Sequence, residues 1–214
     1  FTPLKNKDVD FRLKVKSSRF LSYFFHLPLE IEKVSFISGY LDSKKKRINF
    51  TSWIPQFTYN GEHYSEASLY LNGTSDSLRL LAQVCKMFDQ TNVQIVLNSS
   101  IAYNQIAPHL QWKSTNTNGS KGTIQALCRF FGNDQKDKIA NIHLYPSEIA
   151  IKDTLWSISP SDIALEKSCI TLTPIELRRG NQYISISNSK KRNNAYLISL
   201  KDIEIAHIQD LLNF

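Results

Sequence analysis

Lys33-Val34-Ser35-Phe36-Ile37-Ser38-Gly39-Tyr40-Leu41-Asp42-Ser43 is the stretch whose secondary structure decides the fold of the chain. As a helix beginning near residue 29, it would place apolar residues at three- and four-residue spacing, with Glu30 and Glu32 in the first turn. As a strand, residues 34–41 would pair with residues 48–54 across the basic turn between them. β-Branched and aromatic residues favour that strand too. Local propensity leaves both structures open.

The pattern downstream favours the helix. Residues 81–88 and 124–131 share their apolar, cysteine, basic and phenylalanine positions at an offset of 43 residues. Each has the apolar spacing of an amphipathic helix, and strand-like segments at 66–72, 93–97 and 109–114 lie around them. The sequence therefore predicts two tandem β-β-α units behind the helix.

The end of the chain predicts a third unit of this kind. We expect a hairpin of residues 182–187 with 195–200, and a terminal helix marked by Ile205, Ile208, Leu211 and Leu212. A strand at 10–16, a strand at 139–145, a short helix at 160–167 and a strand at 169–175 complete the pattern. The predicted fold class is α+β, with tandem β-β-α units and a mixed or antiparallel sheet. Its expected parts are a lead-in at 1–28, an α-ββα-ββα domain at 29–135 and a smaller α+β domain at 136–214.

Composition and charge set the expected class and partner. The 214 residues are 42% hydrophobic and 21% charged, as in ordinary globular proteins, and the net charge of +7 favours a polyanionic partner such as nucleic acid. No apolar run reaches the length of a membrane span, and the first residues do not resemble a signal peptide. We expect an intracellular protein or a fragment of one, with Cys85, Cys128 and Cys169 as free thiols.

The motif Ile37-Ser38-Gly39-Tyr40-Leu41-Asp42-Ser43-Lys44 resembles a degenerate signature of the LAGLIDADG homing endonuclease and maturase family. Gly39 matches the small residue that lets two signature helices pack, and Asp42 matches the first acid of the motif. The resemblance covers roughly residues 29–131. It implies a helix followed by two β-β-α units, and a protein that acts on nucleic acid.

One departure from the family changes the expected activity. The acidic residue near the end of the signature helix binds the divalent metal in that family, and Lys44 occupies this position here. An ammonium repels a metal ion that needs oxygen ligands. The resemblance therefore predicts nucleic-acid binding without catalysis and without a cofactor.

The alternative function is a metal-dependent DNA endonuclease, of LAGLIDADG or PD-(D/E)xK type. Asp42-Ser43-Lys44 matches the acid-x-Lys half of the latter pattern, with Glu30 or Glu32 as the second acid, and Mg²⁺ would then be the cofactor. The five histidines have no metal-binding spacing, and no glycine-rich phosphate loop is present. A third possibility is a structural or assembly subunit of a nucleoprotein complex.

The binding prediction rests on cations at strand ends and turns, which would contact the phosphates of DNA or structured RNA. Trp53, Tyr59, Tyr64 and Trp112 are candidates for stacking on bases. The predicted binding residues are Lys14, Lys16, Lys44, Lys45, Lys46, Arg47, Lys113, Arg178, Arg179, Lys190, Lys191 and Arg192.

Overall fold

The computed structural model describes residues 8–18, 22–24, 26, 28–88, 91–116, 119–132, 137–151, 154–189 and 195–203. The chain divides into two compact units. Unit 1 comprises Phe1–Tyr103 and Ser114–Asn116, and unit 2 comprises Asn104–Lys113 and Thr117–Phe214. No helix among the described residues has the length and hydropathy needed to cross a membrane.

The predicted α+β fold class is wrong, because the described residues form seventeen β-strands in a nearly all-antiparallel arrangement. The stretch at 33–43 contains strand β3 (Ser35–Asp42), so the strand alternative is confirmed and the helix is not. The predicted helices at 81–88 and 124–131 lie in strands β6 (Ser77–Phe88) and β9 (Lys121–Phe130). The predicted helix at 160–167 is mostly strand β13 (Ser161–Glu166).

Strand β6 shows the physical reason for the error. Its alternate residues Leu78 and Leu80 share one face of the sheet, and Leu81 and Cys85 lie on the other face. Apolar residues on both faces reproduce the three- and four-residue spacing of a helix. The extended backbone is then fixed by pairing with strands on both sides, which local periodicity does not report.

Several expected strands are confirmed. The segments at 10–16, 66–72, 93–97, 109–114 and 139–145 all lie largely in strands. The hairpin expected at 182–187 and 195–200 is also present, with residues 183–188 paired to 196–201. The segment at 169–175 is interrupted by Pro174 and contributes to two strands. The predicted terminal helix from Ile205 lies outside the described residues.

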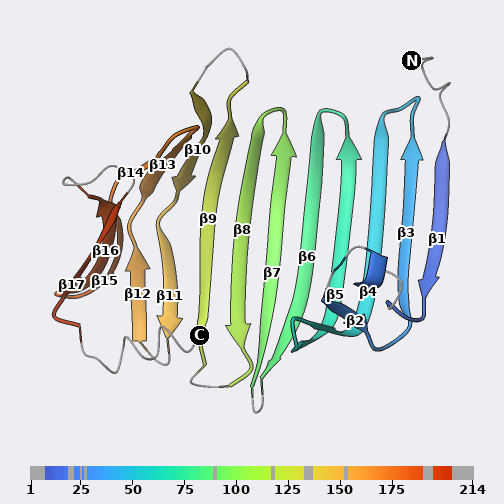
Figure 1. Cartoon of the computed structure of the whole chain (residues 1–214), viewed down its shortest axis with the longest axis horizontal. Coiled ribbons are helices and arrows are strands. Elements are labelled where there is room, and N and C mark those ends of the chain that lie inside the picture. The colour runs from blue at the N-terminus through green and yellow to red at the C-terminus, as the bar shows by residue number, and fades with distance from the viewer. Residues whose placement is uncertain are drawn as a thin grey trace. The chain divides into compact units, whose positions relative to one another are not determined.

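Unit 1 is a sheet of long antiparallel strands (Figure 1). Pairing runs in the order β1, β3, β4, β5, β6, β7, and β2 pairs with the far end of β4. The strands not yet given are β1 (Val9–Val15), β2 (Leu29–Ile31), β4 (Arg47–Tyr59), β5 (Glu62–Thr74) and β7 (Thr91–Ala102).

Unit 2 is a second antiparallel arrangement, in which β9 pairs with β8 on one side and with β10 and β11 on the other. β10 then pairs with β13, and β11 with β12. β13 pairs with β14, and β12 pairs with β15. β16 pairs with β15 on one side and with β17 on the other. The remaining bounds are β8 (Gln105–Ser114), β10 (Lys138–Leu144), β11 (Ser147–Ile151), β12 (Thr154–Ile158), β14 (Ile170–Leu172), β15 (Ile175–Arg179), β16 (Gln182–Asn188) and β17 (Tyr196–Lys201).

Three evenly spaced prolines interrupt the strands of unit 2. Pro146, Pro160 and Pro174 follow one another at fourteen-residue intervals and separate β10 from β11, β12 from β13 and β14 from β15. Leu144 pairs with Ser161 and Ser147 pairs with Ile158, so the register is the same on both sides of the first break. The two strands on either side of a proline, such as β10 and β11, therefore follow one continuous strand path. The ladder hydrogen bonds are missing at the proline, because proline has no N–H to donate.

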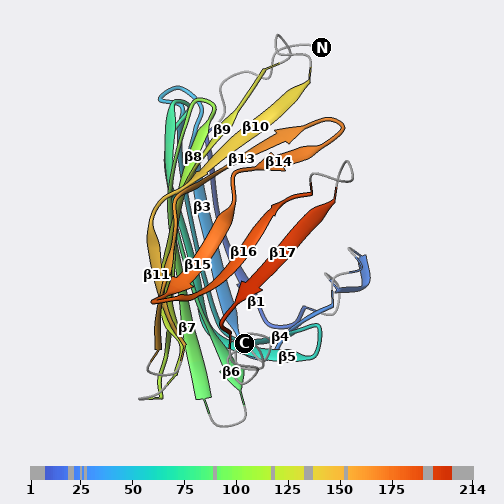
Figure 2. The same cartoon turned by 90° about the vertical axis from the view of Figure 1, so that its left-hand side faces the viewer.

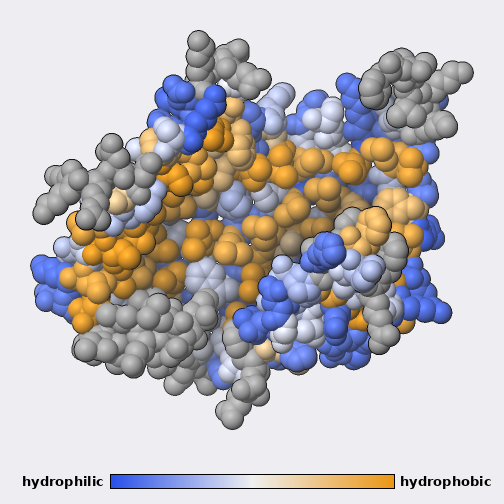
Figure 3. Space-filling view, in the orientation of Figure 1, coloured by the Kyte–Doolittle hydropathy of each residue, from blue (hydrophilic) through white to orange (hydrophobic). Residues whose placement is uncertain are grey.

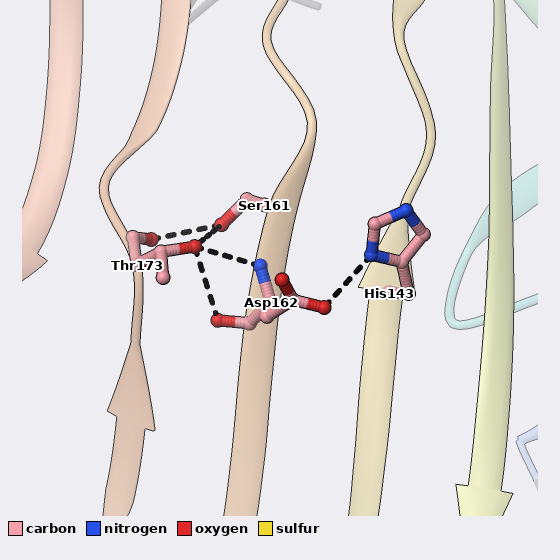
Figure 4. Close-up of polar contacts among 4 residues, drawn as sticks. All are labelled: His143, Ser161, Asp162 and Thr173. Carbon is pink, nitrogen blue, oxygen red and sulfur yellow. Dashed lines mark hydrogen bonds and ion pairs between the residues drawn. The ribbon is translucent and has the colours of Figure 1, made fainter.

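Hydroxyl groups replace part of the lost ladder (Figure 4). Ser161 Oγ donates to the Thr173 carbonyl at 2.8 Å, and the Asp162 N–H donates to Thr173 Oγ1 at 2.7 Å. Next to this break, β10 and β11 run in different directions (Figure 2). The buried hydrophobic side chains among the described residues all belong to unit 2: Ala126, Ala140, Ala150 and Trp156.

Candidate functional site

The most distinctive feature of unit 1 is a sheet face whose rows carry no charged residue up to the row of Val84 and Ile95. Beyond that row, Lys86 forms an ion pair with Glu62 at 3.4 Å. Residues paired across antiparallel strands share a face, so the registers from β1 to β7 define its rows. One row, for example, contains Phe11, Gly39, Phe50, Leu71 and Leu80. We call the large side chains of these rows the unit 1 apolar face: Val9, Phe11, Leu13, Ile37, Leu41, Ile48, Phe50, Ile54, Leu69, Leu71, Leu78, Leu80, Val84, Ile95, Leu97 and Ile101.

The described residues of unit 1 form no second layer that buries this face. Val9 is 47% exposed, Leu13 52% and Leu41 44%, and among the described residues of unit 1 no hydrophobic side chain is fully buried. Figure 3 shows hydrophobic side chains gathered over β3 to β7 on the side of the sheet that faces the viewer. Most folded domains bury such a face against another layer, so this exposure points to a binding surface.

Gly39 adapts the apolar face to an aromatic side chain. A Cβ at Gly39 would lie 2.4 Å from Phe11 Cε1, because the Phe11 ring lies across the glycine. The same ring is 6.5 Å from the Phe50 ring, centroid to centroid. The small residue thus serves a ring lying on a sheet, and not the helix packing that the signature motif predicted.

Unit 2 has a largely apolar face of its own, with Arg179 on the same side at the end of β15. Its rows again follow from the registers, and its edge strand β17 exposes Ile198 by 64% and Leu200 by 52%. The large side chains of this face are Ile106, Leu110, Trp112, Ile124, Ile142, Leu144, Ile149, Trp156, Ile158, Ile163, Leu172, Leu177, Ile184, Ile186, Ile198 and Leu200.

The proposed catalytic acids are not brought together. Asp42 pairs with Arg47 at one end of β4, and Glu32 accepts a hydrogen bond from Thr58 at 2.6 Å near the other end. Eleven residues of strand separate Arg47 from Thr58, which is about 36 Å at ~3.3 Å per residue. Glu30 pairs with Thr58 and is exposed, so it lies at the same distant end.

Asp42 has a structural role in the turn. The Lys45 N–H donates to Asp42 Oδ1 at 2.8 Å, and this bond, with the Lys45 ammonium, lowers the pKa of the Asp42 carboxyl. Its side chain is also nearly buried. An aspartate that accepts the N–H three residues on stabilises a turn, which is the usual role of this residue type at such a position. Among the described residues, no group of three or more His, Cys, Asp or Glu side chains is placed to hold a metal ion.

The predicted nucleic-acid-binding residues fall into separate groups. Lys44, Lys45, Lys46 and Arg47 share one exposed turn. Lys14 pairs with Phe36, which is opposite Trp53, about 20 Å along β4 from Arg47 at ~3.3 Å per residue, and Lys16 follows β1 at that end.

The other predicted cations belong to unit 2. Lys113 is opposite Lys121, and Arg178 forms an ion pair with Glu176 at 2.7 Å. Arg179 pairs with Gln182 across β15 and β16. Lys190, Lys191 and Arg192 lie outside the described residues.

The aromatic candidates for base stacking lie in different places and are not grouped on one surface. Trp53 is 43% exposed on the polar face of unit 1, and Tyr59 is exposed at the end of β4. Tyr64 stacks on Phe57 with ring centroids 5.1 Å apart. Trp112 lies on the apolar face of unit 2, beside Gly122.

Sequence reasoning missed the two apolar faces. The available signal was period-two alternation, clear in β1, where Val9, Phe11 and Leu13 alternate with Asp10, Arg12 and Lys14. Comparison of the chain with protein-family models, with curated proteins and with solved structures gives no match.

Proposed function

We propose that unit 1 binds an elongated apolar ligand of the acyl-chain type along its apolar face. The observation that carries the proposal is the uncharged rows of six strands, whose large side chains remain partly exposed. Each methylene that such a surface removes from water contributes about 0.8 kcal/mol. A chain of ten methylenes would gain about 8 kcal/mol before the cost of ordering it.

The chemistry of the face favours an aliphatic ligand over a polar one. Its rows contain leucine, isoleucine, valine and phenylalanine, with Ser35, Ser52 and Ser99 as the hydroxyl-bearing members. A polar ligand would lose hydrogen bonds to water there without replacement, at a cost of about 1–3 kcal/mol for each group. An acyl chain loses none.

The test is titration with a fluorescent long-chain fatty acid. Leu71→Glu places a carboxylate within the apolar face, and Asn72→Glu places the same group one residue away on the polar face. We expect Leu71→Glu to weaken binding at least about tenfold, because a charge opposes burial of a chain beside it, and Asn72→Glu to bind as the parent does. Absence of binding by the parent, or equal binding by both variants, would refute the proposal.

Nucleic-acid binding stays a prediction, favoured by the four exposed cations of the turn at 44–47. Phosphate contacts of this kind give an affinity that falls steeply with salt. Filter binding of duplex DNA and structured RNA at rising salt tests it, with Lys44, Lys45 and Lys46 changed together to Gln as the variant. An affinity no tighter than about micromolar at low salt would contradict the prediction. The separation of Asp42 from Glu30 and Glu32 gives no support to metal-dependent cleavage by these acids.

A further inference from the structure

The polar face of unit 1 carries a cluster of exposed aromatic side chains that the proposed function does not use. Phe36 is 52% exposed, Trp53 43%, and Tyr40 and Tyr70 42% each. All four lie on the face opposite the apolar one, where most other side chains are polar. We call Phe36, Tyr40, Trp53 and Tyr70 the aromatic frame.

The aromatic frame surrounds a pair of hydroxyl groups. Ser38 and Thr51 are directly opposite each other, with their oxygens 2.7 Å apart. Phe36 and Tyr40 are two residues before and after Ser38 on β3, and Trp53 is two residues after Thr51 on β4. Tyr70 pairs with Thr51 from β5. Adjacent strands are about 4.8 Å apart and alternate residues about 6.7 Å apart, so the frame has the size of one or two sugar rings.

This arrangement has the chemistry that recognises a carbohydrate. The faces of aromatic rings carry partial negative charge and attract the C–H groups on the flat side of a sugar ring. The Ser38–Thr51 pair uses one of its two hydroxyl protons internally, so the second can be donated to a ligand. Asn49 and Asn72 extend the hydrogen-bonding surface beyond Tyr40 along the same face.

The charges around the frame favour a neutral ligand over a nucleic acid. Arg12 pairs with Ser38 and Lys14 with Phe36, and Asp10 pairs with Tyr40. Asp42 is also close, because the Tyr40 hydroxyl lies 3.5 Å from Asp42 Oδ2. On the same face Arg47 is opposite Asp42 and Arg79 is opposite Asn72, and Asp8 accepts a hydrogen bond from the Ser43 N–H. Four cations therefore lie among three carboxylates. Surfaces that hold single-stranded nucleic acid combine stacking rings with a large excess of positive charge, whereas charges of both signs nearly balance here.

We propose that the aromatic frame binds a neutral polysaccharide strand, with Trp53 and Phe36 as the stacking platform and Ser38 and Thr51 as hydrogen-bonding groups. The site is on the opposite side of the sheet from the apolar face. Failure of either proposal therefore leaves the other unaffected.

The test is binding of soluble cello- and chito-oligosaccharides and of insoluble cellulose and chitin, followed by calorimetry and by sedimentation with the polymer. We expect binding that changes little with salt, and a loss of at least about tenfold in affinity for Trp53→Ala. Tyr103→Ala is the matched control, since Tyr103 is a 92% exposed aromatic residue in unit 1 outside the frame. It should bind as the parent does.

Three results would overturn the proposal. The first is no binding of any of these glycans by the parent protein. The second is equal loss of binding in Trp53→Ala and Tyr103→Ala, and the third is binding to single-stranded DNA that falls with salt and depends on Trp53, without glycan binding. Phe36→Leu keeps an apolar side chain in the strand but removes a ring, and it should weaken glycan binding with an unchanged far-ultraviolet circular dichroism spectrum.

Discussion

Replacing Gly122 with alanine should lower the free energy of unfolding of unit 2, because side chains of the neighbouring strands fill the space beside Gly122. A Cβ at Gly122 would lie 2.4 Å from Trp112 Cζ2 on one side and 2.8 Å from Ile149 Cγ2 on the other. Trp112 and Ile149 belong to the two strands paired with β9 on either side of Gly122, so both side chains would have to shift to make room. Inserting a methyl group into such a space costs about 1–3 kcal/mol.

The matched control is Gly132→Ala, since a Cβ there would meet no atom within 4 Å. Urea unfolding followed by far-ultraviolet circular dichroism should show Gly122→Ala less stable than Gly132→Ala. With a slope of about 2 kcal/mol per molar, a 2 kcal/mol cost lowers the midpoint by about 1 M. In a Trp112→Leu background the cost should shrink, because the ring that blocks the Cβ is gone. Equal stability of the two alanine variants, or an equal cost in both backgrounds, would refute the reasoning.

The remaining predictions concern the turn, a thiol and the proline breaks. Asp42→Asn should lower the stability of the protein at about pH 7 and much less at about pH 3. A carboxyl whose pKa is lowered in the folded protein stabilises the fold above its unfolded pKa, and this stabilisation is lost as the pH falls. An equal effect at both pH values in urea titrations would contradict this. Glu166→Gln should speed alkylation of Cys169, because the pKa of this thiol is raised chiefly by its hydrogen bond to Glu166. The alkylation rate of Cys128 should stay the same, because burial raises the pKa of that thiol. Mass spectrometry of iodoacetamide-treated protein measures both rates, and an unchanged Cys169 rate would argue against the hydrogen bond. Ser161→Ala should lower the free energy of unfolding by about 1–2 kcal/mol, because the buried hydroxyl donates to the Thr173 carbonyl. Amide hydrogen exchange should also become faster around Thr173. Unchanged exchange there would show that the hydroxyl does not replace the missing ladder hydrogen bonds.

Among the strands that local sequence predicts correctly, β1 has the clearest contrast between its two faces. In β1, charged residues alternate with apolar ones, and the hairpin of β16 and β17 has strand-forming residues on both sides of a polar turn. Strands β6 and β9 lack this contrast, because Leu81 and Leu127 are apolar residues on the polar faces of their units. A helix then satisfies the local spacing equally well.

The candidate catalytic site failed for a related reason. Asp42 and Glu32 are ten residues apart in the sequence, which is about 15 Å along a helix and about 33 Å along a strand. In the sheet, the chain between them runs the length of β3, and hydrogen bonds to the turn occupy Asp42.

By itself, the sequence determined the free cysteines, the basic turn at 44–47 and the alternation of the clearest strands, because these depend on composition and on neighbouring residues. Only the tertiary structure decided that the rows of apolar residues line up across six strands of unit 1 and stay partly exposed among its described residues. The physical reason is that a side chain's face has meaning only relative to the strands paired with it. Pairs such as β1 with β3, or β12 with β15, join segments that local sequence does not connect.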